Sequence, residues 1–177
     1  LALDVGADVR SRASRGVDDT YGEVFTRRWI VDLILDLAGY TADRDLAVLT
    51  AVEPACGTGA FLVPMVERLV DSCERHNRPI TDARHAIRAF DLLPTNAELA
   101  QKAVTVVLMD SGHPFDVAHD LAATWIECRD FLLTDDAKAD FVLGNPPYIR
   151  LEDVPAERQA AYRAACPTMR GRSDVFV

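Results

Sequence analysis

A strand-like apolar run that passes through a glycine turn into a helix is the feature that most constrains this chain. The run LAVLTAV (46–52) leads directly into EPACGTGAFL (53–62), where Gly57 and Gly59 carry no side chains. The apolar residues that follow recur at helical spacing: Val63, Val66, Leu69 and Val70. At a turn of this kind, backbone N–H groups can approach a ligand closely. We therefore expect a strand, a ligand-accessible turn and a helix in direct succession.

The same alternation continues along the chain. HAIRAFD (85–91) predicts a strand, and PTNAELAQKAVTVVL (94–108) predicts a helix capped by Thr95. Two further strand candidates are TWIECRDF (124–131) and ADFVLGNPPY (139–148). Strands that alternate with helices favour an α/β fold, in which a parallel sheet carries helices on both faces. In such sheets ligands bind beyond the carboxyl ends of the strands.

A helix is also predicted ahead of the first strand. Its apolar residues are Trp29, Ile30, Leu33, Ile34 and Leu37. Thr26 is the expected N-cap, and Gly39 lies just past the expected end. Residues 1–20 mix charged and small residues without apolar periodicity, so we expect a flexible arm there and one domain over residues 21–177.

Composition narrows the class of protein. A chain of 177 residues with 49% hydrophobic residues can bury one core, and it has no apolar run near the roughly 18 to 20 residues of a membrane span. We expect a soluble cytoplasmic protein. The four cysteines and four histidines lack metal-binding spacing, so no metal site is predicted. The net charge of −9 predicts poor DNA binding by this chain alone.

The glycine turn and the next strand end together indicate a cofactor that contains adenosine. Asp91 ends the second predicted strand, where a carboxylate can accept the hydroxyl hydrogens of a ribose. Leu62 stands where a dinucleotide-binding turn would have its third glycine, which argues against NAD. Asp130 and Phe131 follow the third predicted strand. They could contact an adenine, or they could be an ordinary turn beside a core phenylalanine.

NPPY (145–148) is the most specific motif. Two prolines after a strand hold the backbone extended and rigid beside a pocket. An aromatic amine is a poor nucleophile unless hydrogen-bond acceptors localise its lone pair. The side-chain oxygen of Asn145 and the carbonyl of Pro146 could accept from such an amine, and Tyr148 could stack on a base flipped out of a duplex.

With these motifs the chain resembles the amino-methyltransferases that act on adenine in DNA, in their gamma-order branch. That branch has a block before the glycine turn similar to GEVFTRRWIV (22–31), although Arg27 replaces the usual proline. The resemblance implies that Thr26 holds the cofactor carboxylate, and that Glu53 and the loop from Ala55 through Gly57 to Gly59 hold its methionine part. It implies that Asp91 binds the ribose, and that Asp130 and Phe131 meet the cofactor adenine. The implied target-base residues are Asn145, Pro146, Pro147 and Tyr148.

The resemblance also implies a Rossmann-like methyltransferase fold, S-adenosylmethionine as cofactor, and methylation of the 6-amino group of a flipped adenine in a restriction-modification or phage-defence system. We expect double-stranded DNA to be bound through a recognition region beyond Val177, the last sheet strands also to lie there, and the truncated sheet edge to allow self-association. Three alternatives stay open at this point: a methyltransferase acting on a release-factor glutamine, one acting on an RNA guanine amino group, and a non-catalytic scaffold.

Overall fold

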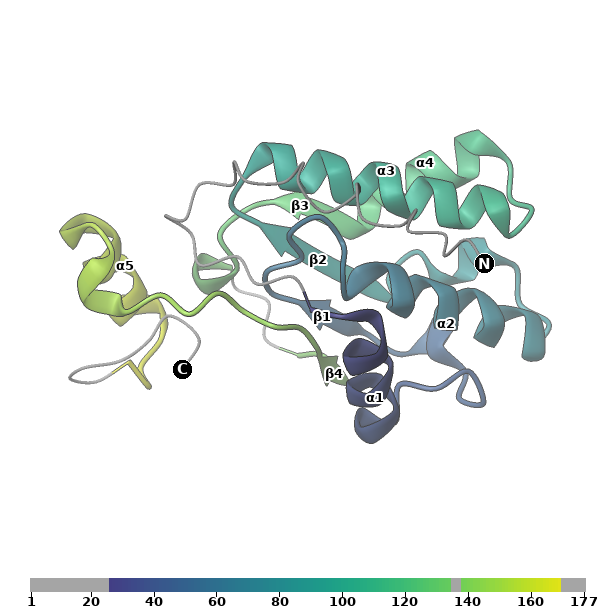
Figure 1. Ribbon diagram of the computed structural model, residues 1–177, viewed down its shortest axis with the longest axis horizontal. Coiled ribbons are helices and arrows are strands. Elements are labelled where there is room, and N and C mark those ends of the chain that lie inside the picture. The colour runs from purple at the N-terminus through teal and green to yellow at the C-terminus, as the bar shows by residue number, and fades with distance from the viewer. Residues whose placement is uncertain (1–25, 135–137, 170–177) are drawn as a thin grey trace, which may run out of the picture.

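A four-stranded parallel sheet lies at the centre of the computed structural model, which describes residues 26–134 and 138–169 (Figure 1). The strand order is β3-β2-β1-β4. The strands are β1 (Ala51–Glu53), β2 (Ile87–Asp91), β3 (Ile126–Cys128) and β4 (Phe141–Val142). The helices are α1 (Arg28–Ala38), α2 (Leu62–Arg75), α3 (Pro94–Asp110), α4 (Phe115–Trp125) and α5 (Ala156–Ala165). The predicted α/β class and parallel sheet are confirmed.

The strand register sorts the sheet residues onto two faces. Ala51 pairs with both Ile87 and Phe141, and all three belong to the main core, which they share with residues of α1, α2, α3 and α4. On the opposite face, Val52 pairs with Arg88 and with Val142, which is 65% exposed. Within the described residues, helices therefore cover one face of the sheet. The expectation that helices also cover the other face stays a prediction.

All four predicted strands are shorter than expected, and the first and third show why. Residues Leu46–Val48 form a 3-10 turn, and the strand begins only at Ala51. The turn is held against α2, because the Leu46 N–H donates to the Ser72 hydroxyl at 2.9 Å. At the third strand, Trp125 ends α4, a helix that the sequence analysis missed, and the indole of Trp125 donates to the Ala83 carbonyl at 3.1 Å.

The predicted helix ends are partly correct. Gly39 caps α1 in the left-handed conformation, at φ 72°, as expected. Thr26 and Thr95, however, are not N-caps: Arg27 precedes α1, and Leu93 precedes α3. Pro94 itself forms the first turn of α3, because it has a fixed φ suited to that position and needs no N–H partner there.

The buried face of α1 also differs from the prediction. Val31 and Leu35 are fully buried, whereas Trp29, Leu33 and Leu37 are among the exposed large hydrophobic residues. The helix carries apolar residues on most of its sides, so spacing alone did not identify the side that packs.

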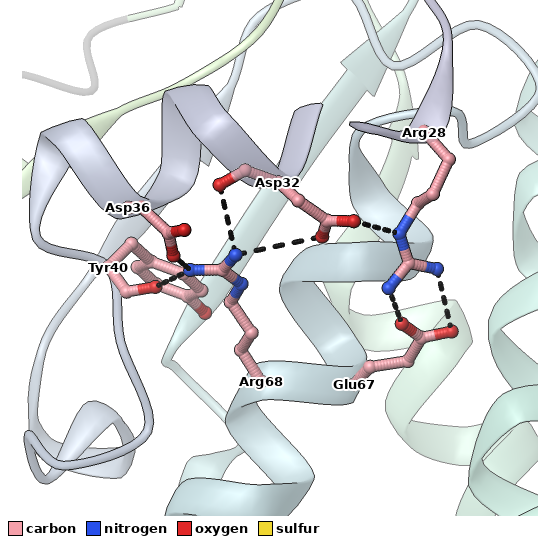
Figure 2. Close-up of polar contacts among 6 residues, drawn as sticks. All are labelled: Arg28, Asp32, Asp36, Tyr40, Glu67 and Arg68. Carbon is pink, nitrogen blue, oxygen red and sulfur yellow. Dashed lines mark hydrogen bonds and ion pairs between the residues drawn. The ribbon is translucent and has the colours of Figure 1, made fainter. Parts of the chain in front are cut away.

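Ion pairs and hydrogen bonds made by Arg28 and Arg68 hold α1 against α2, and we call this set of contacts the clasp (Figure 2). Arg28 reaches Glu67 with two guanidinium nitrogens, at 2.5 and 3.3 Å. Arg68 of α2 donates to the Asp36 carboxylate at 2.6 Å and to the backbone carbonyls of Asp32 and Tyr40, each at 3.0 Å. Because Arg68 is only 17% exposed, this half of the clasp is the better shielded from water. The clasp fixes the start of α1 relative to the glycine turn.

The chain leaves the sheet through β4, and α5 lies off its carboxyl edge (Figure 1). A small second core, formed by Leu151, Tyr162 and Met169, joins α5 to the 3-10 turn Phe131–Leu133. β4 is one of the two edge strands of the described sheet, and β3 is the other. Self-association through this edge stays a prediction. None of the helices in the described part of the chain is long and apolar enough to cross a membrane. The predicted arm, residues 1–20, lies outside the described residues.

Candidate functional site

The glycine turn is closed tightly against the neighbouring elements. The Cys56 N–H donates to the Phe90 carbonyl of β2 at 2.8 Å. Gly57 and Gly59 have φ values of 53° and 101°, a region that residues with side chains seldom adopt. A Cβ on Gly59 would lie 3.7 Å from the Cα of Ala100 in α3. The turn therefore has its shape because glycine stands at both positions.

Asp91 organises this turn from the end of β2. Its two carboxylate oxygens accept from the Gly57 N–H at 2.9 Å and from the Leu93 N–H at 2.8 Å. A carboxylate offers about four acceptor positions, so these two bonds leave room for further donors. Asp91 thus holds the loop in place, and its role as a ribose ligand stays a prediction.

Glu53, the last residue of β1, is a buried carboxylic acid. It is 2% exposed, and its Oε2 has no hydrogen-bond partner among the described residues. Burial, reinforced by the nearby charge of Asp91, raises the pKa of Glu53 well above its ordinary value. A buried carboxyl oxygen of this kind is suited to receive a hydrogen-bond donor or a cation.

Cys56 lies in the same turn and is 3% exposed. Burial, with smaller contributions from Glu53 and Asp91, raises the pKa of its thiol. A thiol with a raised pKa is a weak nucleophile, because the thiolate is the reactive form. Cys56 is therefore a small core residue of the turn.

Asp130 and Phe131 lie beyond β3, at the same edge of the sheet. The Phe131 ring packs on Phe90, with centroids 5.5 Å apart. Asp130 accepts from the Leu132 N–H at 3.3 Å and from the Tyr162 hydroxyl of α5 at 2.7 Å. The bond to Asp130, second to burial, raises the pKa of Tyr162. The predicted contact of this pair with an adenine stays a prediction.

The segment of residues 145–148 follows β4 and returns to the start of α1. The Leu143 N–H donates to the Val52 carbonyl at 2.8 Å, which extends the pairing of β4 with β1. Beyond it, the Asn145 side-chain nitrogen donates to the Thr26 hydroxyl at 3.2 Å, and the Asn145 side-chain oxygen accepts from the Tyr148 hydroxyl at 3.3 Å. Tyr148 is 67% exposed, and Pro146 and Pro147 are partly buried.

Hydrogen bonds join some of the predicted site residues in two separate groups. Asp91 holds Gly57, and Asn145 bonds to Thr26 and Tyr148. Ala55 is partly buried in the turn, and no described side-chain contact supports its predicted role in cofactor binding. Asp130 and Phe131 connect to the others only through the ring of Phe90, as far as the described contacts extend.

Gly144 was missed by the sequence analysis. A Cβ at this position would lie 3.4 Å from Cγ of Glu53 and 3.6 Å from Cδ of Pro54. The segment before Asn145 therefore passes directly over the end of β1. A glycine at the end of a strand is a sign of such a close approach, and this sign was present in LGNPPY.

Comparisons with known proteins identify the family of this chain. The family model described as N-6 DNA Methylase matches residues 12–175. The chain belongs to the N-6 DNA methylase family. It is 40% identical over 164 residues to the type II methyltransferase M.XhoI of Xanthomonas vasicola, covering 90% of this chain and 30% of that protein. It is 39% identical over 178 residues to the type II methyltransferase M.PaeR7I of Pseudomonas aeruginosa, covering 98% of this chain and 31% of that one.

Two further matches are a third type II methyltransferase and a solved structure. The type II methyltransferase M.BstVI of Geobacillus stearothermophilus is 37% identical over 166 residues, covering 89% of this chain and 30% of that protein. A solved modification subunit from Vibrio vulnificus is 24% identical, with a TM-score of 0.47 over 79% of this chain and 28% of that chain. This N-6 DNA methylase chain spans about 30% of the length of its type II relatives.

Proposed function

We propose that this chain is the cofactor-binding and catalytic part of an adenine-specific DNA methyltransferase of a restriction-modification or phage-defence system. The proposed reaction moves a methyl group from S-adenosylmethionine to the 6-amino group of an adenine flipped out of double-stranded DNA. The observation that carries the proposal is the placement of the Asn145 amide. The amide is held by Thr26 and Tyr148, and the residue before it, Gly144, lies against the buried Glu53 end of β1.

The residues present fit such a cofactor. S-adenosylmethionine supplies an electrophilic methyl group on a sulfonium, together with an ammonium, a carboxylate and a ribose. The Glu53 carboxyl, whose Oε2 lacks a partner among the described residues, suits the ammonium. The Thr26 hydroxyl suits the carboxylate, and the remaining acceptor positions of Asp91 suit the ribose. Gly57, Gly59 and Ala55 would leave the backbone of the turn accessible, and Asp130 and Phe131 would meet the adenine.

The chain's own residues would make the target nitrogen nucleophilic. The Asn145 oxygen and the Pro146 carbonyl accept from the two amine hydrogens, which turns the nitrogen lone pair toward the methyl group. S-adenosylmethionine would supply the methyl group to the nitrogen lone pair, its sulfur would keep the electron pair of the former S–C bond, and the methylated nitrogen would release one proton to water. The Asn145 bond strengthens as positive charge develops on the nitrogen, so it stabilises the transition state more than the ground state. Tyr148 offers its ring to the flipped base, and Pro147 keeps the segment rigid.

We assign recognition of DNA largely to other parts of the gene product. A net charge of −9 gives this chain little attraction for phosphates, which normally supply much of the affinity for DNA. Double-stranded DNA is therefore the proposed partner of the whole protein rather than of this chain alone.

Replacing Asn145 by alanine tests the proposal in the full-length gene product. We expect single-turnover transfer of labelled methyl to adenine in duplex DNA to slow by about 100-fold or more. Cofactor affinity, measured by calorimetry, should stay within about threefold. The matched control is Asn77→Gly, which lies just past α2 in a left-handed turn at φ 53° and should keep the wild-type rate.

Two outcomes would contradict this proposal. Wild-type turnover by Asn145→Ala would remove the 145–148 segment from catalysis. A wild-type enzyme that methylates a protein glutamine or an RNA guanine, but not adenine in DNA, would support one of the alternative substrates instead.

A further inference from the structure

The amide of Asn145 is held at both ends by hydroxyl groups. Its nitrogen donates to Thr26 Oγ1 at 3.2 Å, and its oxygen accepts from the Tyr148 hydroxyl at 3.3 Å. Thr26 is partly buried just before α1, 119 positions away in the sequence. Arg28, the first residue of α1, bonds to Glu67 of α2 and keeps this end of α1 in place (Figure 2).

The orientation of this amide decides whether it can assist methyl transfer. Its oxygen only accepts hydrogen bonds and its nitrogen only donates them. An amine that is to be methylated presents hydrogens, so it requires the oxygen. A half-turn of the amide would present the nitrogen instead, and two donors would then face each other. The observed orientation, with the nitrogen on Thr26, is the productive one.

Hydroxyl neighbours do not by themselves fix that orientation, because a hydroxyl can either donate or accept. Thr26 has a single hydrogen. If that hydrogen is donated to a carboxylate, which only accepts, then Thr26 has only lone pairs to offer Asn145. The amide must then turn its nitrogen to Thr26 and its oxygen away from it. A carboxylate bound at Thr26 would therefore select the productive orientation.

We propose that Thr26 is a positioning residue that couples cofactor binding to the orientation of the Asn145 amide. The coupling rests on the proposed function, because it uses the carboxylate of the cofactor's methionine part. Before a target base binds, the Tyr148 hydroxyl donates to the Asn145 side-chain oxygen, which is the atom that must accept from the target amine. Cofactor binding prepares the acceptor, and the incoming base displaces the hydroxyl.

The test uses the full-length gene product with Thr26→Val and Thr26→Ser. The matched control is Thr81→Val, which alters an exposed threonine in the 3-10 turn before β2, at the opposite edge of the sheet. Capture of a 2-aminopurine target is measured with and without S-adenosylhomocysteine. We expect this ligand to tighten capture about tenfold in wild type and by less than twofold in Thr26→Val. Thr26→Ser should retain most of the coupling.

Rates at saturating cofactor distinguish positioning from simple binding. Thr26→Val should transfer methyl groups about tenfold more slowly, the effect of one lost hydrogen bond, and added cofactor should not restore the rate. In an Asn145→Ala background, Thr26→Val should slow transfer by less than twofold, because its effect passes through that amide. A wild-type rate and wild-type coupling in Thr26→Val, with only cofactor affinity reduced, would overturn the proposal. That outcome leaves the proposed function intact, whereas an unimpaired Asn145→Ala enzyme would overturn both.

Discussion

Glu53 is the residue at which folding and function conflict most clearly. The sequence predicted its place beside the glycine turn, since EPACGTG marks the strand end. Its burial could not be predicted, because it depends on Gly144, which follows β4 far along the chain and lies against the Glu53 side chain. A buried carboxyl without a partner lowers the stability of the fold. Such a cost is common at sites that are prepared for a ligand.

A Glu53→Gln variant should show this cost as a pH dependence. Near pH 4.5, the ordinary pKa of the residue, the two proteins should differ little. As the pH rises, unfolded wild type loses this proton while the folded form keeps it, because the folded pKa is raised. Wild-type stability therefore falls relative to the variant, by at most about 1.4 kcal/mol per pH unit.

Urea unfolding at pH 5, 6, 7 and 8 measures the difference in unfolding free energy. Glu74→Gln, at an exposed position of α2, serves as the control and should show no such trend. A constant difference between Glu53→Gln and wild type across this range would mean that Glu53 is ionised in the folded protein.

Gly59 offers a second test at the scale of single residues. Alanine at this position must adopt a φ of 101°, which costs about 1 to 3 kcal/mol of stability. Gly112→Ala imposes a similar strain at φ 88°, with nothing within 4 Å, in the loop after α3. Both variants should lower the melting temperature, but only Gly59→Ala should also weaken cofactor binding in calorimetry. Equal cofactor affinity in the two variants would remove the turn from the cofactor site.

At the scale of elements, the sequence predicted whether a segment is a helix or a strand better than it predicted where that helix or strand begins and ends. α4 escaped prediction because its buried residues include the small Ala118 and Ala122, which add little to an apolar pattern, and because Trp125 runs directly into strand residue Ile126. The N-caps were misplaced because threonine was chosen by residue type, whereas Pro94 determined where α3 begins. Which side of α1 packs against the core depends on the neighbouring elements, so it could not be predicted from the sequence of the helix alone.

The clasp between α1 and α2 predicts a difference between two arginines. Arg68→Met removes charge-assisted bonds to Asp36 and to two backbone carbonyls at a position shielded from water, so it should cost about 1.5 to 3 kcal/mol. Arg84→Met removes an exposed pair with Asp120, which water screens, so it should cost much less stability than Arg68→Met. Urea unfolding measures both costs.

The same pair of variants tests whether the clasp positions Thr26. Arg68→Met should slow methyl transfer under conditions where the enzyme is fully folded, and Arg84→Met should not. Equal rates in the two variants would show that α1 stays in place without Arg68.

At the scale of the whole molecule, the sequence predicted which edge of the sheet carries most of the candidate residues. The glycine turn, Asp91, Asp130 and the 145–148 segment each end or follow a strand, and parallel strands bring their carboxyl ends to one edge. Contacts within that edge were beyond prediction. The bond between Thr26 and Asn145 joins positions 119 residues apart, and the Tyr162 bond to Asp130 comes from a helix outside the sheet. The spacing of residues along the chain does not predict contacts between residues so far apart in the sequence.

The net charge of −9 leads to the last prediction, which concerns how DNA is held. A protein that neutralises several phosphates releases counterions, so its affinity falls steeply with salt concentration. The 177-residue chain should bind duplex DNA more weakly than about 0.1 mM at 150 mM salt, because few phosphate contacts are available to it. Its affinity should also change little between 50 and 200 mM salt, whereas the full-length gene product should show a steep decrease. Fluorescence anisotropy with a labelled duplex measures both slopes. Tight, strongly salt-dependent binding by the chain alone would mean that its arginines form a phosphate-binding surface despite the overall charge, and DNA recognition would then have to be assigned to this domain.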